Sequence, residues 1–339
     1  MQEFFDPLKN PTLVAAPFFI LSLLIELAAF KYLETDAEMR GYERKDARTS
    51  LVMGLGSIVS SAVFKLGTLV AFVAISVHLA PWHLPDDAWW SWAALILGLD
   101  LAFYLQHRFV HRVRVGWAAH QAHHSSEYFN FSTALRQKWN PWAEALFWLP
   151  FPFLGFEPWT LYVAFAVNLI YQFFVHTERI DTMWRPIELI FNTPSHHRVH
   201  HGSDPEYLDK NYAGMLIIWD RMFGTFQKEL FRPTYGLTVP VDTYNLLRLQ
   251  YGAFGELFRD VHNARNWREK LGYVFMPPGW HPGEKRAEAE QRHSVHDRCD
   301  NDAAKDRVQR MSAATEQAGA ANNGGGDHIE NDGSAVEAG

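Results

Sequence analysis

The sequence lacks three features that would direct its chemistry elsewhere. Its single cysteine, Cys299, allows neither a disulfide within the chain nor a cysteine-ligated iron-sulfur cluster or four-thiolate zinc site. There is no Gly-x-Gly-x-x-Gly nucleotide loop, and therefore no electron supply of its own. No basic stripe with interleaved aromatic residues occurs, and the formal net charge is -7, so we expect no nucleic-acid partner. Any metal site must rely on histidine.

Long apolar runs fill the first half of the sequence. Residues 13–30 are apolar apart from one serine and Glu26, and are just long enough to cross a hydrocarbon core of about 30 Å as a helix. They lack the basic start and the cleavage site of a signal peptide, so we expect them to stay in the mature protein. Residues 51–80, which include Lys65, and residues 88–106 predict two further spans.

The stretch 142–175 is also apolar, with three prolines and Gly155 near its middle, and we interpret it as a helical hairpin that dips into the membrane and returns. The predicted fold is all-α, an integral membrane bundle of about four transmembrane helices with the last pair re-entrant. Five Lys and Arg residues lie in the 31–50 loop and none in the 81–87 connection, which places the first loop in the cytosol.

The second half of the sequence is polar. From about residue 177 it is mixed and aromatic-rich, and from Gly283 it becomes charged and finally rich in Gly, Asn, Ala and Asp. We predict a membrane-embedded domain over residues 1–282, with a catalytic core at about 95–226, and a disordered polar tail over residues 283–339.

Histidine is concentrated in one region, because ten of the 17 histidines lie between residues 107 and 201. Within three clusters the spacing is i, i+3 or i+4, which places the imidazoles on one helical face. So many exceed the needs of one acid-base site, and imidazole is the commonest metal ligand. The hairpin would bring all of them to the cytosolic side. The candidate ligands are His107, His111, His120, His123, His124, His176, His196, His197, His200 and His201.

Eight to ten histidines predict two metal ions, because one first-row ion accepts about four to six ligands. Zinc, copper, iron and nickel all suit imidazole. The clusters begin where an apolar span ends, which favours a hydrophobic substrate, and attack on its C–H bonds needs an O2-activating centre. We therefore favour a non-haem di-iron site. A haem-binding membrane electron carrier, a zinc-dependent membrane hydrolase and a metal transporter are the alternatives.

The pattern His-x-x-x-His at 107–111, then His-x-x-His-His at 120–124 and at 197–201, after membrane helices, resembles the sterol desaturase and fatty acid hydroxylase superfamily. The likeness covers roughly residues 95–226 and is greatest to the alkylglycerol monooxygenase-like branch. It is carried by the segments His120–Glu127, Thr133–Gln137, His176–Glu178, Pro194–Gly202, Lys210–Gly214 and Trp219–Phe226.

The resemblance implies an O2-dependent membrane enzyme that hydroxylates or desaturates a lipid: a sterol, a fatty acyl chain or an alkylglycerol ether. A separate electron donor (a reductase, a cytochrome or a pterin) would supply the enzyme with electrons. The ether-lipid enzymes of the branch use tetrahydrobiopterin and have further membrane helices near the C-terminus, whereas no long apolar segment follows Phe226 here. Two iron ions would be held by His107, His111, His120, His123, His124, His197, His200 and His201, with His176 and His196 as extras.

Several other residues have more than one interpretation. Asp100, in the third apolar run, is either a neutral buried carboxyl or an acceptor for the N–H of a ligand. Glu26 and Lys65 are interpreted as snorkelling to the interface. Arg136 and Gln137 would meet a lipid head group or the reductant. Asn211, Asp220 and Arg221 either serve the site or pack and cap a cytosolic helix, and the isolated His78, His83 and His262 are assigned no metal.

Overall fold

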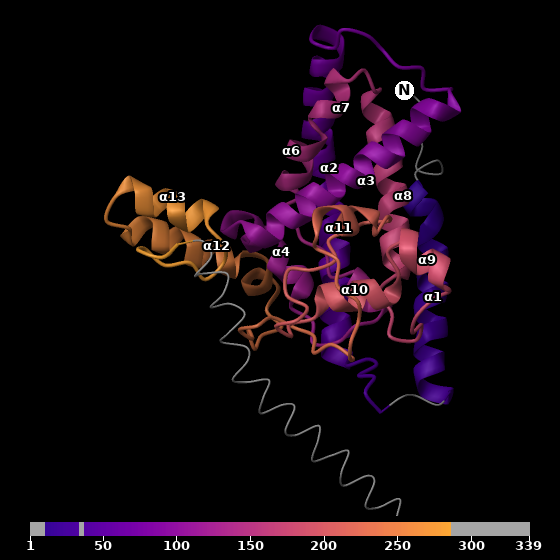
Figure 1. Cartoon of the computed structure of the whole chain (residues 1–339), viewed down its shortest axis with the longest axis vertical. Helices are drawn as coiled ribbons and strands as arrows, with labels where there is room; N and C mark the ends of the chain where they lie inside the picture. Colours follow the sequence, from indigo (N-terminus) through magenta and orange to yellow (C-terminus); the bar gives the residue numbers. More distant parts are fainter. Residues whose placement is uncertain (1–10, 34–36, 286–339) are drawn as a thin grey trace, which may run out of the picture. The chain divides into compact units, whose positions relative to one another are not determined.

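A computed structural model describes residues 11–33 and 37–285, so the predicted tail lies outside the described residues from residue 286 onward. Within those residues the regular elements are helices joined by loops, with one isolated antiparallel bridge between Gly202 and Tyr235, which confirms the all-α prediction. In chain order the helices are α1 (Pro11–Tyr32), α2 (Arg44–His78), α3 (Trp89–Arg112), α4 (Arg114–His124), α5 (Phe131–Ala134), α6 (Trp142–Trp148), α7 (Pro150–Phe153), α8 (Pro158–Phe174), α9 (Arg185–Ile190), α10 (Pro194–His201), α11 (Ile218–Phe223), α12 (Leu246–Asn263) and α13 (Trp267–Phe275) (Figure 1).

Three of the described helices, α1, α2 and α3, are long and apolar enough to cross a membrane, as the three apolar runs predict. Helices α1 and α2 leave most of their apolar side chains exposed, which suits lipid contact, and α3 is half buried at the centre of the bundle. Helix α3 continues six residues beyond the predicted end of its span. Because of this extension, it carries His107 and His111 on its final turns.

The stretch 142–175 forms a helical hairpin. Helices α6 and α7 run up to Gly155, whose φ of 88° lets the chain turn, and α8 returns from Pro158. The Trp148 ring packs on the Phe165 ring with centroids 4.4 Å apart, which ties the two arms together. The hairpin shares one apolar core with α2 and α3, built around Phe72, Leu95, Leu99, Phe103, Phe151 and Leu161. A fourth membrane crossing stays a prediction.

Two short helices, α4 and α10, carry all the remaining candidate histidines except His176, which follows α8. The extended backbone of Val113 breaks the chain between α3 and α4, which redirects the second histidine cluster. Helix α10 begins with Pro194 in its first turn, where the missing N–H costs no hydrogen bond, after Thr193 as N-cap. Helix α12 packs along α4, with Leu249 against Ala122 and Met53.

Candidate metal centre

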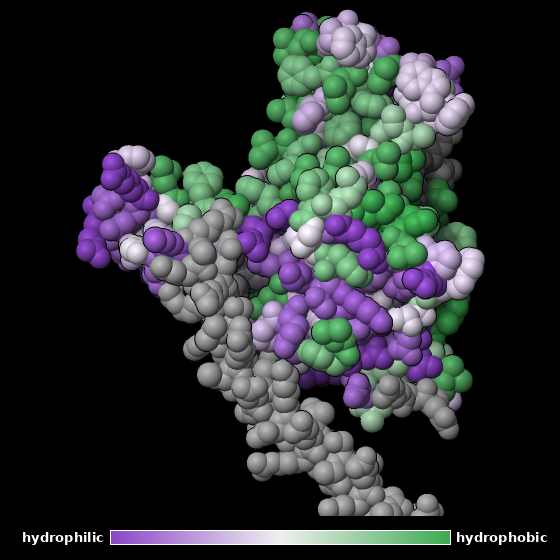
Figure 2. Space-filling view, in the orientation of Figure 1, coloured by the Kyte–Doolittle hydropathy of each residue, from purple (hydrophilic) through white to green (hydrophobic). Residues whose placement is uncertain are grey.

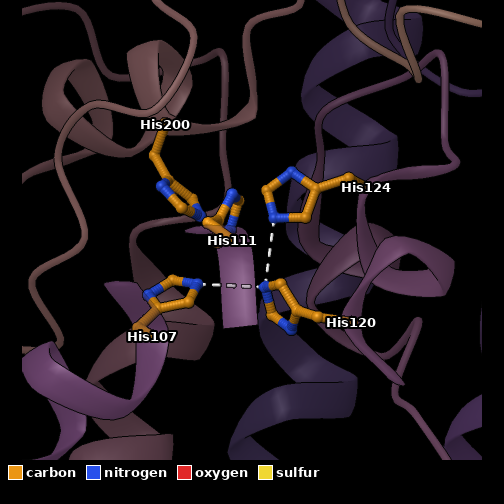
Figure 3. A group of neighbouring side chains, drawn as sticks. All are labelled: His107, His111, His120, His124 and His200. Atoms are coloured by element: carbon orange, nitrogen blue, oxygen red, sulfur yellow. Dashed lines mark hydrogen bonds between the residues drawn. The ribbon is translucent and has the colours of Figure 1, made fainter. Parts of the chain in front are cut away.

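Nine of the ten candidate histidines converge in the interior, in two adjacent groups. They come from four places in the chain: α3, α4, α10 and the residue two positions after α8. In each group the ring nitrogens lie within 4.8 Å of one another. The first group, drawn in Figure 3, is His107, His111, His120, His124 and His200, and the second is His123, His176, His197 and His201.

Backbone carbonyls fix the orientation of four of these rings. A carbonyl can only accept, so each ring nitrogen facing one carries the proton and its other nitrogen carries a lone pair. The Nδ1–H of His107 donates to the carbonyl of Tyr212 (2.9 Å), and that of His200 to the carbonyl of Lys210 (3.1 Å). In the second group the acceptors are the carbonyls of Arg136 and Gln172. Such partners are typical of metal-ligating histidines.

The nitrogens that face inward are spaced as ligands of one ion would be. Two nitrogens bound about 2.0–2.1 Å from an ion at a near-tetrahedral angle are about 3.4 Å apart, and less at smaller angles. The Nε2 atom of His120 lies 3.0 Å from Nε2 of His107 and 3.2 Å from Nε2 of His124. Three buried Nε2 atoms, those of His111, His200 and His201, have no hydrogen-bond partner. His120 and His197 face their neighbours through Nε2, and their Nδ1 atoms on the other side of the ring are also without a partner. Two groups of neutral imidazole nitrogens at this spacing fit two transition-metal cations that favour imidazole ligands.

The rings outside the membrane spans are held in the neutral, metal-binding form. Burial lowers the pKa of His176 to about 3 and that of His200 to about 4. For His120, burial and the neighbouring His107 and His124 place the pKa well below its ordinary value. Neutral imidazoles have lone pairs to offer, so no proton must be displaced when a metal binds.

His196 is the exception among the ten. It lies buried on α10, but its Nε2 pairs with a Glu188 carboxylate oxygen at 2.8 Å, away from both groups. Burial acts to raise the pKa of Glu188, yet the hydrogen bonds from His196 and from the Met183 N–H outweigh it and lower the pKa to about 2. Instead of the expected metal role, His196 makes a contact with a carboxylate that fastens α10 to α9.

Asp100 is buried, as the first of its two interpretations has it, and it accepts no hydrogen bond from a candidate ligand. Its carboxylate accepts hydrogen bonds from the Met215 and Leu216 N–H groups, the Trp219 indole and the Asn168 amide. Met215 and Leu216 lie in a loop, Trp219 on α11 and Asn168 on α8, and none of the partners is a histidine. The same loop includes the Tyr212 carbonyl that orients His107. Asp100 therefore affects the histidines indirectly, by holding this loop in place.

Three residues after the last cluster, Asn211, Asp220 and Arg221, have the packing and capping roles that were one of their two interpretations. Asp220 accepts from the Tyr212 and Ala213 N–H groups and from the Thr225 hydroxyl. Asn211, at a positive φ of 53°, donates to the carbonyls of His196 and Gln227. The Arg221 guanidinium lies 3.7 Å from the Phe226 ring centroid and donates to the Glu188 carbonyl. All three pack and cap.

Arg136 is buried, whereas for Gln137, which is half buried, the head-group role stays a prediction. The Arg136 side chain is 1% exposed and donates to Asp46 at 2.7 Å and to the hydroxyls of Ser50 and Ser125. The expectation that it meets a lipid head group or the reductant is therefore wrong, because no part of it reaches the surface. The side-chain amide of Gln137 donates to the Ala134 carbonyl, and the backbone carbonyl of Gln137 accepts from the side-chain amide of Gln250.

Glu26 does not snorkel. It is 3% exposed, and its carboxylate accepts from the Phe131 N–H at 2.8 Å and from the hydroxyls of Tyr42 and Thr177. Thr177 directly follows His176, so the first span holds a histidine segment in place. Lys65 is half buried on α2, and its snorkelling stays a prediction.

Sequence reasoning also missed the surroundings of the rings. The carbonyls of Lys210, Tyr212 and Gln172 leave no trace in a residue pattern. The Trp117 ring contacts His111 and His124, and the Phe129 ring contacts His176 and His201. No pattern in the sequence around these two aromatic residues predicts the contacts. A pocket of about 40 Å³ reaches His111, His124 and His200, which leaves room for a ligand the size of a water molecule.

The apolar spans and the paired imidazole groups define a membrane-embedded metal-binding protein. Residues 92–225 match the fatty acid hydroxylase family model. The chain is 40% identical over 276 residues to the alkylglycerol monooxygenases of Danio rerio and Homo sapiens. In each case the match covers 80% of this chain and 60% of the relative.

A third relative is the ornithine lipid hydroxylase of Rhizobium tropici, 32% identical over 169 residues, which are 46% of this chain and 48% of that protein. No solved structure matches the chain. These matches support the sterol desaturase and fatty acid hydroxylase superfamily, and within it the alkylglycerol monooxygenase-like branch. It spans about 60% of the length of the alkylglycerol monooxygenases that it matches.

Proposed function

We propose that this chain is a non-haem di-iron, O2-dependent oxidoreductase that hydroxylates or desaturates a membrane lipid. One observation carries the proposal: two adjacent groups of buried imidazoles, at the end of apolar spans, turn unpaired nitrogens toward each other. Two irons bound there would supply the redox capacity to activate O2 for attack on a C–H bond. The membrane domain proposed for residues 1–282 contains every part of this centre.

The protein's own residues would hold, orient and shield the metals. Eight or nine imidazoles would bind, with His107, His123, His176 and His200 fixed by carbonyls. Burial of the rings excludes bulk water, which protects a reactive oxidant from unproductive reduction. His196 would contribute indirectly, by anchoring α10 through Glu188.

The substrate and the partners follow from the location and from the relatives. The centre lies where apolar helices end, so a lipid can reach it without leaving the membrane. The relatives' names, alkylglycerol monooxygenase and ornithine lipid hydroxylase, support a lipid substrate, and an alkylglycerol ether is the first to test. A separate donor would supply electrons, because no nucleotide loop is present. The basic 31–50 loop supports a cytosolic orientation.

The alternative of a haem carrier is disfavoured by ring spacing. Rings of the two groups lie close together, with centroids 4.4 Å apart for His124 and His201 and 5.2 Å apart for His197 and His200. A porphyrin needs its two axial histidines on opposite faces of a wide planar ring. The zinc hydrolase alternative needs only one ion with about three ligands and an open position, fewer than the nine histidines gathered here.

Metal analysis with Mössbauer spectroscopy on anaerobically purified, active protein tests the metal. We expect about two irons per chain in a coupled, non-haem state. Two zinc ions in active protein would refute the iron centre, and a Soret band would favour the haem carrier.

Lipid analysis tests the reaction. Cells that produce the chain under O2 should accumulate a lipid that has gained one oxygen atom or lost two hydrogen atoms. His120→Ala should abolish this product, whereas His262→Ala, which replaces an exposed histidine on α12, should leave it unchanged. If both variants kept the product, the chemistry would lie elsewhere.

A further inference from the structure

The α12–α13 hairpin presents an apolar face that no described residue covers. On α12 the exposed side chains Leu247, Tyr251 and Phe258 are spaced i, i+4 and i+11, which places them on one side of the helix. On α13, Trp267, Leu271 and Phe275 follow at i, i+4 and i+8. Their exposed fractions run from 42% for Tyr251 to 74% for Phe258, so these are large apolar side chains in contact with the surroundings.

A different side of α12 carries the packing. Leu249, Gln250 and Leu257 are buried, and α12 packs along α4. The hairpin is therefore already docked through one face, and the exposed apolar face is a second one. Figure 2 shows hydrophobic side chains on the upper side of the hairpin, and hydrophilic ones at its tip.

The hairpin is tied to the end of a membrane span. The N–H of Arg114, two residues after α3 ends, donates to the Met276 carbonyl just after α13, at 3.0 Å. The Arg114 guanidinium also binds the Asp260 carboxylate of α12 and lies over the Tyr273 ring of α13. These contacts hold the hairpin at the depth where α3 leaves the apolar layer.

The composition of the hairpin matches a lipid interface. Aromatic residues with a polar edge, such as Tyr251 and Trp267, are enriched at the boundary between hydrocarbon and head groups. Basic residues flank the apolar face and suit anionic phosphates, namely Arg248, Arg259, Arg265, Arg268 and Lys270. Neither helix is among the described helices long and apolar enough to span, so the face suits lying in the surface layer.

We propose that the α12–α13 hairpin is an interfacial membrane anchor, which inserts this face into the leaflet where α3 ends. The anchor continues the lipid-facing surface of the spans. A phospholipid bilayer is what covers its exposed apolar face. Because α12 packs on α4, which carries His120, His123 and His124, the anchor fixes the histidine groups at the bilayer surface. It does not depend on which metal they bind.

Site-directed spin labelling in phospholipid nanodiscs tests the anchor. In a Cys299→Ser background, a nitroxide is attached to Phe258→Cys or Leu271→Cys, with two controls. Glu256→Cys is an exposed position on another side of α12, and Val63→Cys is an exposed position on the membrane-spanning α2. Collisions with O2, which enriches in lipid, and with the water-soluble complex NiEDDA are measured at each.

We expect the ratio of O2 to NiEDDA collisions at 258 and 271 to match that at Val63→Cys and to exceed that at Glu256→Cys. Frequent NiEDDA collisions at 258 and 271 would mean a face exposed to water and would overturn the proposal. Low collision rates with both reagents would mean that protein covers the face, as in a second copy of the chain, and would overturn it as well. Unchanged elution of the labelled variants on size exclusion verifies their folding.

Discussion

His123 and His176 face each other through two nitrogens that both lack a proton. The Nδ1–H of His123 donates to the Arg136 carbonyl at 3.2 Å, and that of His176 to the Gln172 carbonyl at 2.7 Å. Their Nε2 atoms lie 3.4 Å apart, so two lone pairs oppose each other in a buried space. A cation between them would turn this repulsion into ligation.

His176→Ala should therefore weaken the binding of one of the two proposed ions, because the second group keeps only three imidazoles, and the variant should retain less metal than the parent after dialysis against a chelator. Metal analysis by mass spectrometry measures this. His196→Ala is the matched control, since it removes a buried histidine that lies in neither group.

His196→Ala should keep both metals and lower the free energy of unfolding by about 1–3 kcal/mol, because Glu188 loses its hydrogen-bond partner. Loss of metal in His196→Ala with none in His176→Ala would reverse the assignment of these two residues.

Asp100→Asn should destabilise the loop that orients His107. The substitution replaces one acceptor oxygen with an amide that meets N–H donors, at a cost of about 1–3 kcal/mol. A lower apparent Tm and weaker metal retention against a chelator are the expected results. Asp87→Asn, at an exposed position before α3, should change neither quantity. Equal behaviour of the two variants would contradict the role of Asp100.

Gly214→Ala should be destabilising for a steric reason. An added Cβ would lie 2.7 Å from the Asn168 amide nitrogen and 2.9 Å from an Asp100 carboxylate oxygen, both of them buried. We expect a loss of about 1–3 kcal/mol from overpacking, seen as a lower apparent Tm. Gly67→Ala on α2, where nothing lies within 4 Å of an added Cβ, should show no loss. A tolerated Gly214→Ala would mean that this loop yields easily.

Arg136→Met should cost about 3–5 kcal/mol, because it leaves the Asp46 carboxylate buried without its cation. The double variant Asp46→Leu with Arg136→Met should recover part of that loss. Arg265→Met, which breaks a pair whose arginine is 85% exposed, should have little effect in the same denaturation assay. A stable Arg136→Met with weaker lipid or donor binding would instead restore the head-group interpretation.

The sequence predicts the spans and the histidine groups well because both depend on local repeats. The apolar runs gave α1, α2 and α3, and the i, i+4 spacing placed imidazoles together on α3, α4 and α10. His196 has the same spacing with His200 and still turns away. What decides its role is Glu188 on a neighbouring helix, and only the fold brings that carboxylate close.

Charged residues were harder to predict, because their roles depend on distant partners. Arg136 is separated from Asp46 by 90 positions, and Asp100 from Trp219 by 119. The second half of the sequence is polar, yet α12 and α13 carry an exposed apolar row. The spacing of Leu247, Tyr251 and Phe258 in the sequence indicates one apolar helical face. It does not predict membrane contact by itself, because neither segment is long enough to resemble a span.

The bond from Thr177 to Glu26 bridges 151 positions of the chain, and that from Phe131 bridges 105. The Tyr42 hydroxyl, 16 positions after Glu26, is the one of its three donors that a ribosome releases early. The other two belong to segments that are synthesised much later, so the hydrogen bonds that join α1 to the segment of His176 can form only after α8 has been made.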